Sequence, residues 1–275
     1  MSVIDERYSG LRVLITRPKG RGENIATFIR SRGGEALCFP VIDIIPPPDF
    51  ITMDKVLANV DQYDLFILVS VPAVQSLGRR LMKKKLSLGS VPVAVVGNKT
   101  AESCKDFNIT VTYCPGTDAE QLQNSSLSNA MNSEGLLREL GGFNKVGKKI
   151  AIFRGQDGRE CLGASLQLDG AELEYIECYR RKLTRQSFKP VLECWEKTPF
   201  DAVVITSVSI LEGLLVLLGK DNAYLLKNST VLVISERIAE ACRENGLYNL
   251  VLANGPADGE IMSGLEIMMK SDKSH

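Results

Sequence analysis

Hydroxyl and amine side chains follow the ends of three apolar runs that have the length of strands. Ser70 follows the first run, Lys99 and Thr100 follow the second, and Ser207 follows the third. Small polar residues after a buried strand are typical of helix N-termini, where free backbone N–H groups and the helix dipole favour anions. This spacing predicts that anions bind at these strand ends. The alternative is that the hydroxyls of Ser70, Thr100 and Ser207 only cap helices.

Two arginines and a tyrosine are further candidates for binding or chemistry. Arg17 and Arg154 each follow a predicted strand, and a guanidinium can hold a carboxylate through two parallel hydrogen bonds. A solvated arginine would have the same place in the sequence. Tyr179 lies in a predicted extended segment. It is interpreted either as a core residue or as a hydroxyl donor that reaches into a cleft.

The sequence does not favour the chemistry of histidine or of a bound metal. The only histidine, His275, is the last residue, so neither a Ser-His-Asp triad nor histidine acid–base catalysis is expected. None of the seven cysteines stands in a Cys-x-x-Cys pair, so a Cys/His metal site is not expected. We interpret the cysteines as small buried apolar residues in a reducing compartment.

Two short stretches contain part of a nucleotide-binding motif. Gly20 and Gly22 open a predicted helix, but the third glycine of the dinucleotide fingerprint is missing. Lys99 and Thr100 resemble the end of a P-loop, but Asn98 stands where that motif has glycine. We therefore expect no cofactor.

Charge and hydropathy exclude some partners. The 275 residues include 33 basic and 33 acidic side chains, so the net charge is zero and no field over the whole protein attracts nucleic acid. No apolar run reaches the roughly 18 residues that span a bilayer. The first residues contain no apolar segment of a secretory signal. We expect a cytoplasmic protein without membrane or nucleic-acid partners.

Strands alternate with helices along the chain, which predicts an α/β fold with parallel sheets. The predicted strands are residues 11–15, 35–39, 64–69, 91–96, 109–113, 149–153, 171–176, 200–205, 230–234 and 249–252. The pair of strand-to-helix junctions at 64–102 recurs at 200–241, which indicates an internal repeat. Two similar halves would face each other across one cleft.

Two extended segments predict where the chain passes between these halves. Residues 41–45 are followed by three prolines, which can neither continue a helix nor pair inside a sheet. Residues 178–182 are polar and extended. We therefore predict that domain 1 comprises 1–41 with 184–275 and that domain 2 comprises 46–178. The segments 41–46 and 178–184 form the linker.

Several segments, taken in order, resemble the uroporphyrinogen-III synthase family. They are residues 13–18, 64–67 with Ser70 and 73–74, 95–101, 152–155, 158–160 with Leu162, Leu166, 170–171, 179–180 and 201–207. This resemblance implies two Rossmann- or flavodoxin-like domains with a two-stranded linker, and an active site in the cleft. It also implies the closure of hydroxymethylbilane to uroporphyrinogen III with inversion of ring D and loss of water, without metal or cofactor.

The resemblance also assigns roles to particular residues. It implies that Tyr179 is the leading catalytic candidate and that Thr100 lies in the cleft. The family often has glycine and threonine in the second-half junction, where this chain has Ser235 and Ile238, so Ile238 cannot form a hydrogen bond through its side chain. A monomer and a transient contact with hydroxymethylbilane synthase are further expectations.

The residues suit this reaction. The substrate is flexible and carries eight carboxylates, so the enzyme must mainly hold one bent conformation, and helix N-termini, hydroxyls and arginines can bind the carboxylate arms. A neutral phenol can donate the proton that assists departure of the hydroxyl. The alternative is a cleft-binding protein of periplasmic type or an inactive regulatory family member. The missing signal segment disfavours the first, and the presence of Tyr179 and Thr100 disfavours the second.

Overall fold

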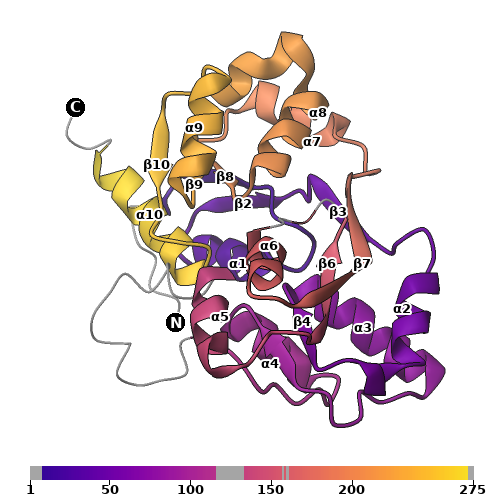
Figure 1. Ribbon diagram of the computed structural model, residues 1–275. Helices are drawn as coiled ribbons and strands as arrows, with labels where there is room; N and C mark the ends of the chain where they lie inside the picture. Colours follow the sequence, from indigo (N-terminus) through magenta and orange to yellow (C-terminus); the bar gives the residue numbers. More distant parts are fainter. Residues whose placement is uncertain (1–7, 116–132, 157, 159–160, 272–275) are drawn as a thin grey trace. The chain divides into compact units, whose positions relative to one another are not determined.

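The computed structural model describes residues 8–115, 133–156, 158 and 161–271 (Figure 1). The chain divides into two compact units, Met1–Asp43 with Lys182–His275 and Ile44–Arg181. Whether 1–41 with 184–275, and 46–178, are independent domains stays a prediction, because proximity of residues does not establish independent folding. None of the described helices is both long enough and apolar enough to cross a membrane.

Unit 1 contains one parallel sheet with helices on both faces. Its elements are β1 (Arg12–Ile15), α1 (Glu23–Ser31), β2 (Glu35–Cys38), α7 (Lys189–Lys197), β8 (Ala202–Ile205), α8 (Val208–Lys227), β9 (Thr230–Val233), α9 (Glu236–Glu244), β10 (Leu250–Leu252) and α10 (Asp258–Ser271). The strand order is β10-β9-β8-β1-β2, and every adjacent pair is parallel. Counted within the unit this is the 2-1-3-4-5 order of flavodoxin-like folds.

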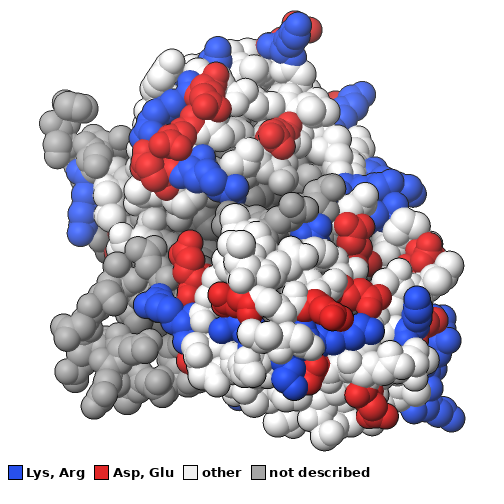
Figure 2. Space-filling view, in the orientation of Figure 1, with Lys and Arg blue, Asp and Glu red and all other residues white. Residues whose placement is uncertain are grey.

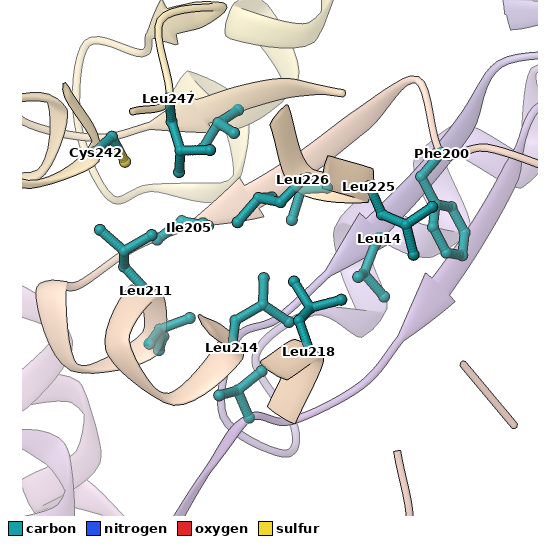
Figure 3. Close-up of a cluster of buried hydrophobic side chains, with 14 of the residues drawn as sticks. Leu14, Phe200, Ile205, Leu211, Leu214, Leu218, Leu225, Leu226, Cys242 and Leu247 are labelled. Carbon is teal, nitrogen blue, oxygen red and sulfur yellow. The ribbon is translucent and has the colours of Figure 1, made fainter. Parts of the chain in front are cut away.

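The core of unit 1 follows from the alternation of side chains along its strands. Leu14 of β1 packs with the helices α7, α8 and α9, whereas its neighbours Val13 and Ile15 pack with α1 and α10. Figure 3 shows Leu214 and Leu218 of α8 gathered with Leu14. Because both faces are buried, the strands consist of continuous apolar runs, which is why the sequence pattern predicted them.

Unit 2 contains a second five-stranded sheet. Its elements are β3 (Ile42–Ile45), α2 (Ile51–Leu57), the 3-10 helix η2 (Val60–Gln62), β4 (Leu65–Leu68), α3 (Val71–Lys84), β5 (Val93–Val95), α4 (Asn98–Lys105), α5 (Ser133–Glu139), the 3-10 helix η4 (Leu140–Gly142), β6 (Lys149–Gly155), α6 (Cys161–Leu168) and β7 (Glu172–Leu183). The strand order is β3-β7-β6-β4-β5. The strands β5, β4, β6 and β7 are parallel and repeat the 2-1-3-4 order of unit 1.

The two faces of the unit 2 sheet are also buried. Phe66 and Leu68 of β4 pack with the helices α2, α3 and α4, while Leu65 and Ile67 pack with α5 and α6. The recurrence of strand order and of two covered faces agrees with the predicted α/β class with two similar parallel sheets.

Two local predictions are corrected by the structure. The predicted strand 109–113 contributes only one bridge, between Ala94 and Tyr113. The backbone N–H groups of Thr112 and Tyr113 both donate to the Val93 carbonyl. The segment therefore does not continue as a strand along β5. Thr100 is not a helix cap, because Gly97 is the N-cap residue of α4. The sequence also predicts a polar, partly helical segment at 118–140. Its residues up to 132 lie outside the described ranges, and α5 and η4 follow them.

Candidate active site

The ends of three neighbouring strands in unit 2 lie level with one another. Leu68 of β4 pairs with Val95 of β5 on one side and with Phe153 of β6 on the other. The residues two positions further along each chain continue this register: Ser70, Gly97 and Gly155. They therefore come to the same carboxyl edge of the sheet, and β4 and β6 flank the point where the strand order reverses. Open α/β sheets bind ligands at this point.

A β-bulge brings Tyr179 to the same level. Arg154 of β6 pairs with Glu177 of β7, but the next residue, Gly155, pairs with Tyr179, so the register shifts and Cys178 has no partner opposite it. Bulges re-aim side chains and are frequent beside active sites. We call Tyr179, Gly155, Ser70 and Gly97 the strand-end row.

The Tyr179 hydroxyl lies against the start of helix α3. Tyr179 is only 3% exposed, and Ser70 Oγ donates a hydrogen bond of 3.0 Å to its phenolic oxygen. Ser70 is also the N-cap of α3 and accepts from the Ala73 N–H at 3.4 Å. The phenol thus lies beside a helix N-terminus, where the dipole is positive.

Arg181 is the second donor to this hydroxyl. Its Nη2 donates to the Tyr179 phenolic oxygen at 3.2 Å, and its Cζ lies 5.4 Å from the centre of the Tyr179 ring. Residues two apart in a strand share one face of the sheet. With Ser70 Oγ as the donor of the first bond, both bonds are donated to the Tyr179 hydroxyl, and its own proton is available for a further acceptor.

Gly155 supplies the space for the phenol. A Cβ atom at this position would lie 2.6 Å from Cζ and 3.0 Å from the hydroxyl oxygen of Tyr179. These separations are shorter than van der Waals contact, so any larger residue displaces the ring. Glycine is therefore required here for clearance.

The neighbouring thiol does not compete as a reactive group. Cys178 Sγ donates to the Arg154 carbonyl at 3.1 Å, and burial raises the pKa of Cys178 to about 12. The thiol therefore stays protonated at neutral pH and is a poor nucleophile. The phenol and hydroxyl of the strand-end row remain the groups suited to proton transfer and anion binding.

Thr100 and Lys99 lie in the first turn of α4, next to Gly97 of the row. Thr100 is the third helical residue and is 5% exposed, while Lys99 is exposed. The first turn of a helix has N–H groups without intrahelical acceptors. The structure thus places these two predicted residues at the same edge as Ser70 and Tyr179, at the end of the adjacent strand.

Arg154 precedes the row by one residue and lies on the opposite face of the sheet. It is 8% exposed, its Nη1 donates to the Gly158 carbonyl at 3.0 Å, and its Cζ stands 4.3 Å from the Tyr175 ring centre. Its Nε has no acceptor among the residues that the structure describes, and its Nη1 donates to a backbone carbonyl and not to a carboxylate. A buried cation without a counter-ion is costly, so this guanidinium is suited to an incoming carboxylate.

The remaining predicted residues belong to unit 1. Arg17 is 7% exposed and forms an ion pair of 2.7 Å with Asp258, and its Nη2 donates to the Pro256 carbonyl at 3.3 Å. Ser207 is the N-cap of α8 and accepts from the Ile210 N–H at 3.2 Å. The N-cap of α9 is Ser235, whose side chain makes no capping bond.

Local groups rather than a large field supply the charge of the site. Lys and Arg are interspersed with Asp and Glu over the face shown in Figure 2, as the net charge of zero predicts. Within the described ranges, no three His, Cys, Asp or Glu side chains are grouped so as to hold a metal ion. The site offers donors for oxyanions: hydroxyls, helix N–H groups and guanidinium groups.

Two residues of this arrangement were missed from the sequence. In the sequence Arg181 is one of several polar residues of an extended segment, and its spacing of two from Tyr179 is the signal that places both on one face of a strand. The role of Gly155 depends on a register shift in β7 that no residue pattern indicated.

The sequence matches the family model described as uroporphyrinogen-III synthase HemD over residues 23–262. It is 28% identical to the uroporphyrinogen-III synthase of Salmonella typhimurium over 256 residues, which cover 92% of this chain and 99% of the relative. It is 27% identical to the uroporphyrinogen-III synthase of Escherichia coli, again with 92% of this chain and 99% of the relative covered. A putative uroporphyrinogen-III synthase of Methanothermobacter thermautotrophicus is 28% identical, with 85% of this chain and 89% of the relative covered.

Solved structures have the same fold. A mutant uroporphyrinogen III synthase of Thermus thermophilus has a TM-score of 0.62 at 18% identity, with 95% of this chain and 100% of that chain covered. The uroporphyrinogen-III synthetase of Helicobacter pylori has a TM-score of 0.62 at 15% identity, with 95% and 99% covered. At these identities the likeness is one of fold, and it confirms the predicted fold class.

Proposed function

The chain belongs to the uroporphyrinogen-III synthase HemD family, and from this membership we propose how its residues carry out the family's reaction. The protein is a uroporphyrinogen-III synthase, a hydro-lyase of tetrapyrrole biosynthesis. Its substrate is hydroxymethylbilane. One observation supports this chemistry most directly. The Tyr179 hydroxyl is hydrogen-bonded to Ser70 and Arg181 at the carboxyl edge of the unit 2 sheet.

The reaction needs a proton at one atom and a fixed conformation elsewhere. The Tyr179 phenol donates its proton to the terminal hydroxyl of the substrate as the C–O bond breaks, and water leaves with the bonding electrons. The positive charge resides on the pyrrole ring as an azafulvenium. The substituted α-carbon of ring D attacks the exocyclic methylene carbon of this azafulvenium and gives a spiro intermediate. The bond from that α-carbon to the methylene of ring C then breaks and leaves a second azafulvenium on ring C. The free α-carbon of ring D attacks the ring C methylene and closes the inverted macrocycle, and the proton that this carbon loses returns to the phenolate.

Positioning provides the rest of the catalysis. Closure without inversion of ring D requires only that the chain ends meet, whereas inversion requires a bent conformation to be held. We expect the α3 N-terminus at Ser70 and the α4 N-terminus at Lys99 and Thr100 to bind acetate or propionate arms through hydroxyl, N–H and amine donors. Both helix starts stand at the carboxyl edge of the sheet, on adjacent strands.

Arg154 is proposed to bind a further carboxylate arm. Its burial and its unpaired Nε leave a positive charge uncompensated among the described residues, and a carboxylate would compensate it. Because Arg154 lies on the opposite face from Tyr179, its effect is expected on substrate affinity and not on the proton transfer.

Two residues of unit 1, Ser207 and Arg17, are also proposed to bind carboxylate arms. Ser207 already accepts from a helix N–H, but its hydroxyl can still donate to a carboxylate. Arg17 is paired with Asp258, which leaves its Nε as the donor without a partner. The shared cleft, the monomeric state, the cytoplasmic location and a transient contact with hydroxymethylbilane synthase all stay predictions.

A coupled assay tests the function directly. Porphobilinogen and hydroxymethylbilane synthase supply the unstable substrate, and the oxidised products are separated into isomers I and III. We expect isomer III to form in proportion to the added protein. Isomer I alone would contradict the assignment and favour the alternative, a non-catalytic binding or regulatory member of the family.

A further inference from the structure

We infer that Arg181 is a positioning residue for this reaction, which holds the Tyr179 hydroxyl so that its proton is directed at the substrate. The inference rests on the proposed function, because it assigns a role within the same site. It begins from the two hydrogen bonds at the phenolic oxygen, one from Ser70 Oγ at 3.0 Å and one from Arg181 Nη2 at 3.2 Å.

These two hydrogen bonds decide which way the phenol can donate. A guanidinium has no acceptor atom, so the contact with Arg181 must be donated to Tyr179. With Ser70 Oγ as the donor of the second bond, the two contacts fill the acceptor positions of the phenolic oxygen. The proton of Tyr179 is then left for an acceptor outside the pair. Because Arg181 can only donate, its contact directs the Tyr179 proton away from the guanidinium, whichever hydroxyl donates in the contact with Ser70.

The charge of Arg181 also suits the transition state. Negative charge develops on the phenolic oxygen as its proton moves to the departing hydroxyl, and a cation already hydrogen-bonded there stabilises that charge without reorganisation. The guanidinium is held near the ring as well, with Cζ at 5.4 Å from the ring centre. Ser70 can orient the phenol but carries no charge.

Among the residues that the structure describes, the side-chain contacts of Arg181 assign it no structural task. Its side chain is exposed, and its hydrogen bond and ring contact are both with Tyr179. Ser70, by contrast, also caps α3, so its removal would change stability and activity together. Substitution of Arg181 therefore tests the orientation of the phenol with little effect on folding.

The test compares turnover and affinity in a small set of variants. We expect Arg181→Ala to lower kcat about tenfold, because one charge-assisted hydrogen bond is lost, with KM changed less than twofold. Arg181→Lys should restore part of kcat, since lysine keeps the charge but not the planar geometry. Lys182→Ala removes the same charge at the next exposed position and should leave kcat unchanged.

A double-mutant cycle with Tyr179→Phe separates the inference from its alternatives. If Arg181 acts through the phenol, Arg181→Ala causes no further loss of kcat in the Tyr179→Phe background. An equal loss in both backgrounds, or a loss that appears in KM, would overturn the inference and indicate a direct contact with the substrate. The unmodified protein is the separate control for the function. If it makes no isomer III, the proposed function fails before any variant is compared.

Discussion

The Tyr179 hydroxyl oxygen lies 3.0 Å from Ser70 Oγ, although the two residues are 109 positions apart in the chain. This contact joins the bulged strand β7 to the first turn of α3 across the end of β6. It therefore brings a proton donor to a helix N-terminus, where carboxylates are stabilised. The strand-end row is the part of the molecule in which a group suited to proton transfer and groups suited to binding anions meet.

Substitution of Gly155 should displace the Tyr179 ring while the phenol hydroxyl itself is retained. Gly155→Ala places a methyl group 2.6 Å from Tyr179 Cζ, so we expect the free energy of unfolding to fall by about 1–3 kcal/mol and kcat to fall in the folded protein. Gly141→Ala is the matched control, because a Cβ there has no neighbour within 4 Å. Equal denaturation midpoints and equal kcat for the two variants would contradict the required clearance.

Thr100 is expected to bind the product and not to stabilise its helix. Thr100→Val keeps the shape of a residue that is 5% exposed, and Gly97 is the N-cap of α4, so the unfolding free energy should change little. Loss of one hydrogen bond should weaken uroporphyrinogen III binding by about 1 kcal/mol, measured by calorimetric titration. Thr110→Val makes the same change at an exposed position. An unchanged dissociation constant for Thr100→Val would limit Thr100 to packing.

The ion pair of Arg17 and Asp258 should contribute to stability. Their side chains are 6% and 28% exposed, so Arg17→Met should lower the unfolding free energy by about 2 kcal/mol. Asp258→Asn should act in the same direction, and the double variant should lose less than the sum. An increase of KM in Arg17→Met alone would support the proposed substrate contact of Arg17, whereas unchanged KM values would restrict it to the ion pair.

Asp54 should make stability depend on pH in the acid range. Hydrogen bonds from Arg80, and to a smaller degree from Lys84, lower the pKa of Asp54 from 3.8 to about 2. A lowered pKa stabilises the folded state above pH 4, and this contribution is lost as pH falls from about 4 to about 2. The pair is partly exposed, so we expect about 1 kcal/mol between the wild type and Asp54→Asn at pH 7.

Acid titration of both proteins by chemical denaturation provides the measurement. The difference in unfolding free energy should be constant above about pH 5 and should disappear near about pH 2. A difference that persists undiminished through this acid range would show that Asp54 does not carry the expected shift.

The sequence indicated the sheets well because their strands are continuous apolar runs, as in residues 65–68 and 202–205. The segment 109–113 misled because it alternates like a strand, yet its N–H groups converge on one carbonyl. The helix starts at Ser70 and Ser207 were predicted correctly by small polar residues after a strand.

The contacts within the strand-end row could not be predicted in the same way. They depend on which strands are neighbours and on the register between β6 and β7, and a shift of one residue changes the face of every side chain. The bulge at Cys178 is a property of that pairing. For the same reason, the spacing of Tyr179 and Arg181 indicates a shared site only when the pairing of the bulged strand β7 with β6 is known.

The partition of hydroxymethylbilane between the two isomers, compared in the wild type and Tyr179→Phe, tests the account most directly. Phenylalanine keeps the buried ring, so thermal unfolding should show a folded variant. We expect the wild type to give isomer III. We expect Tyr179→Phe to form isomer III about a hundredfold more slowly, so that spontaneous closure to isomer I takes over. Formation of isomer III by Tyr179→Phe at the wild-type rate would contradict the role of the phenol.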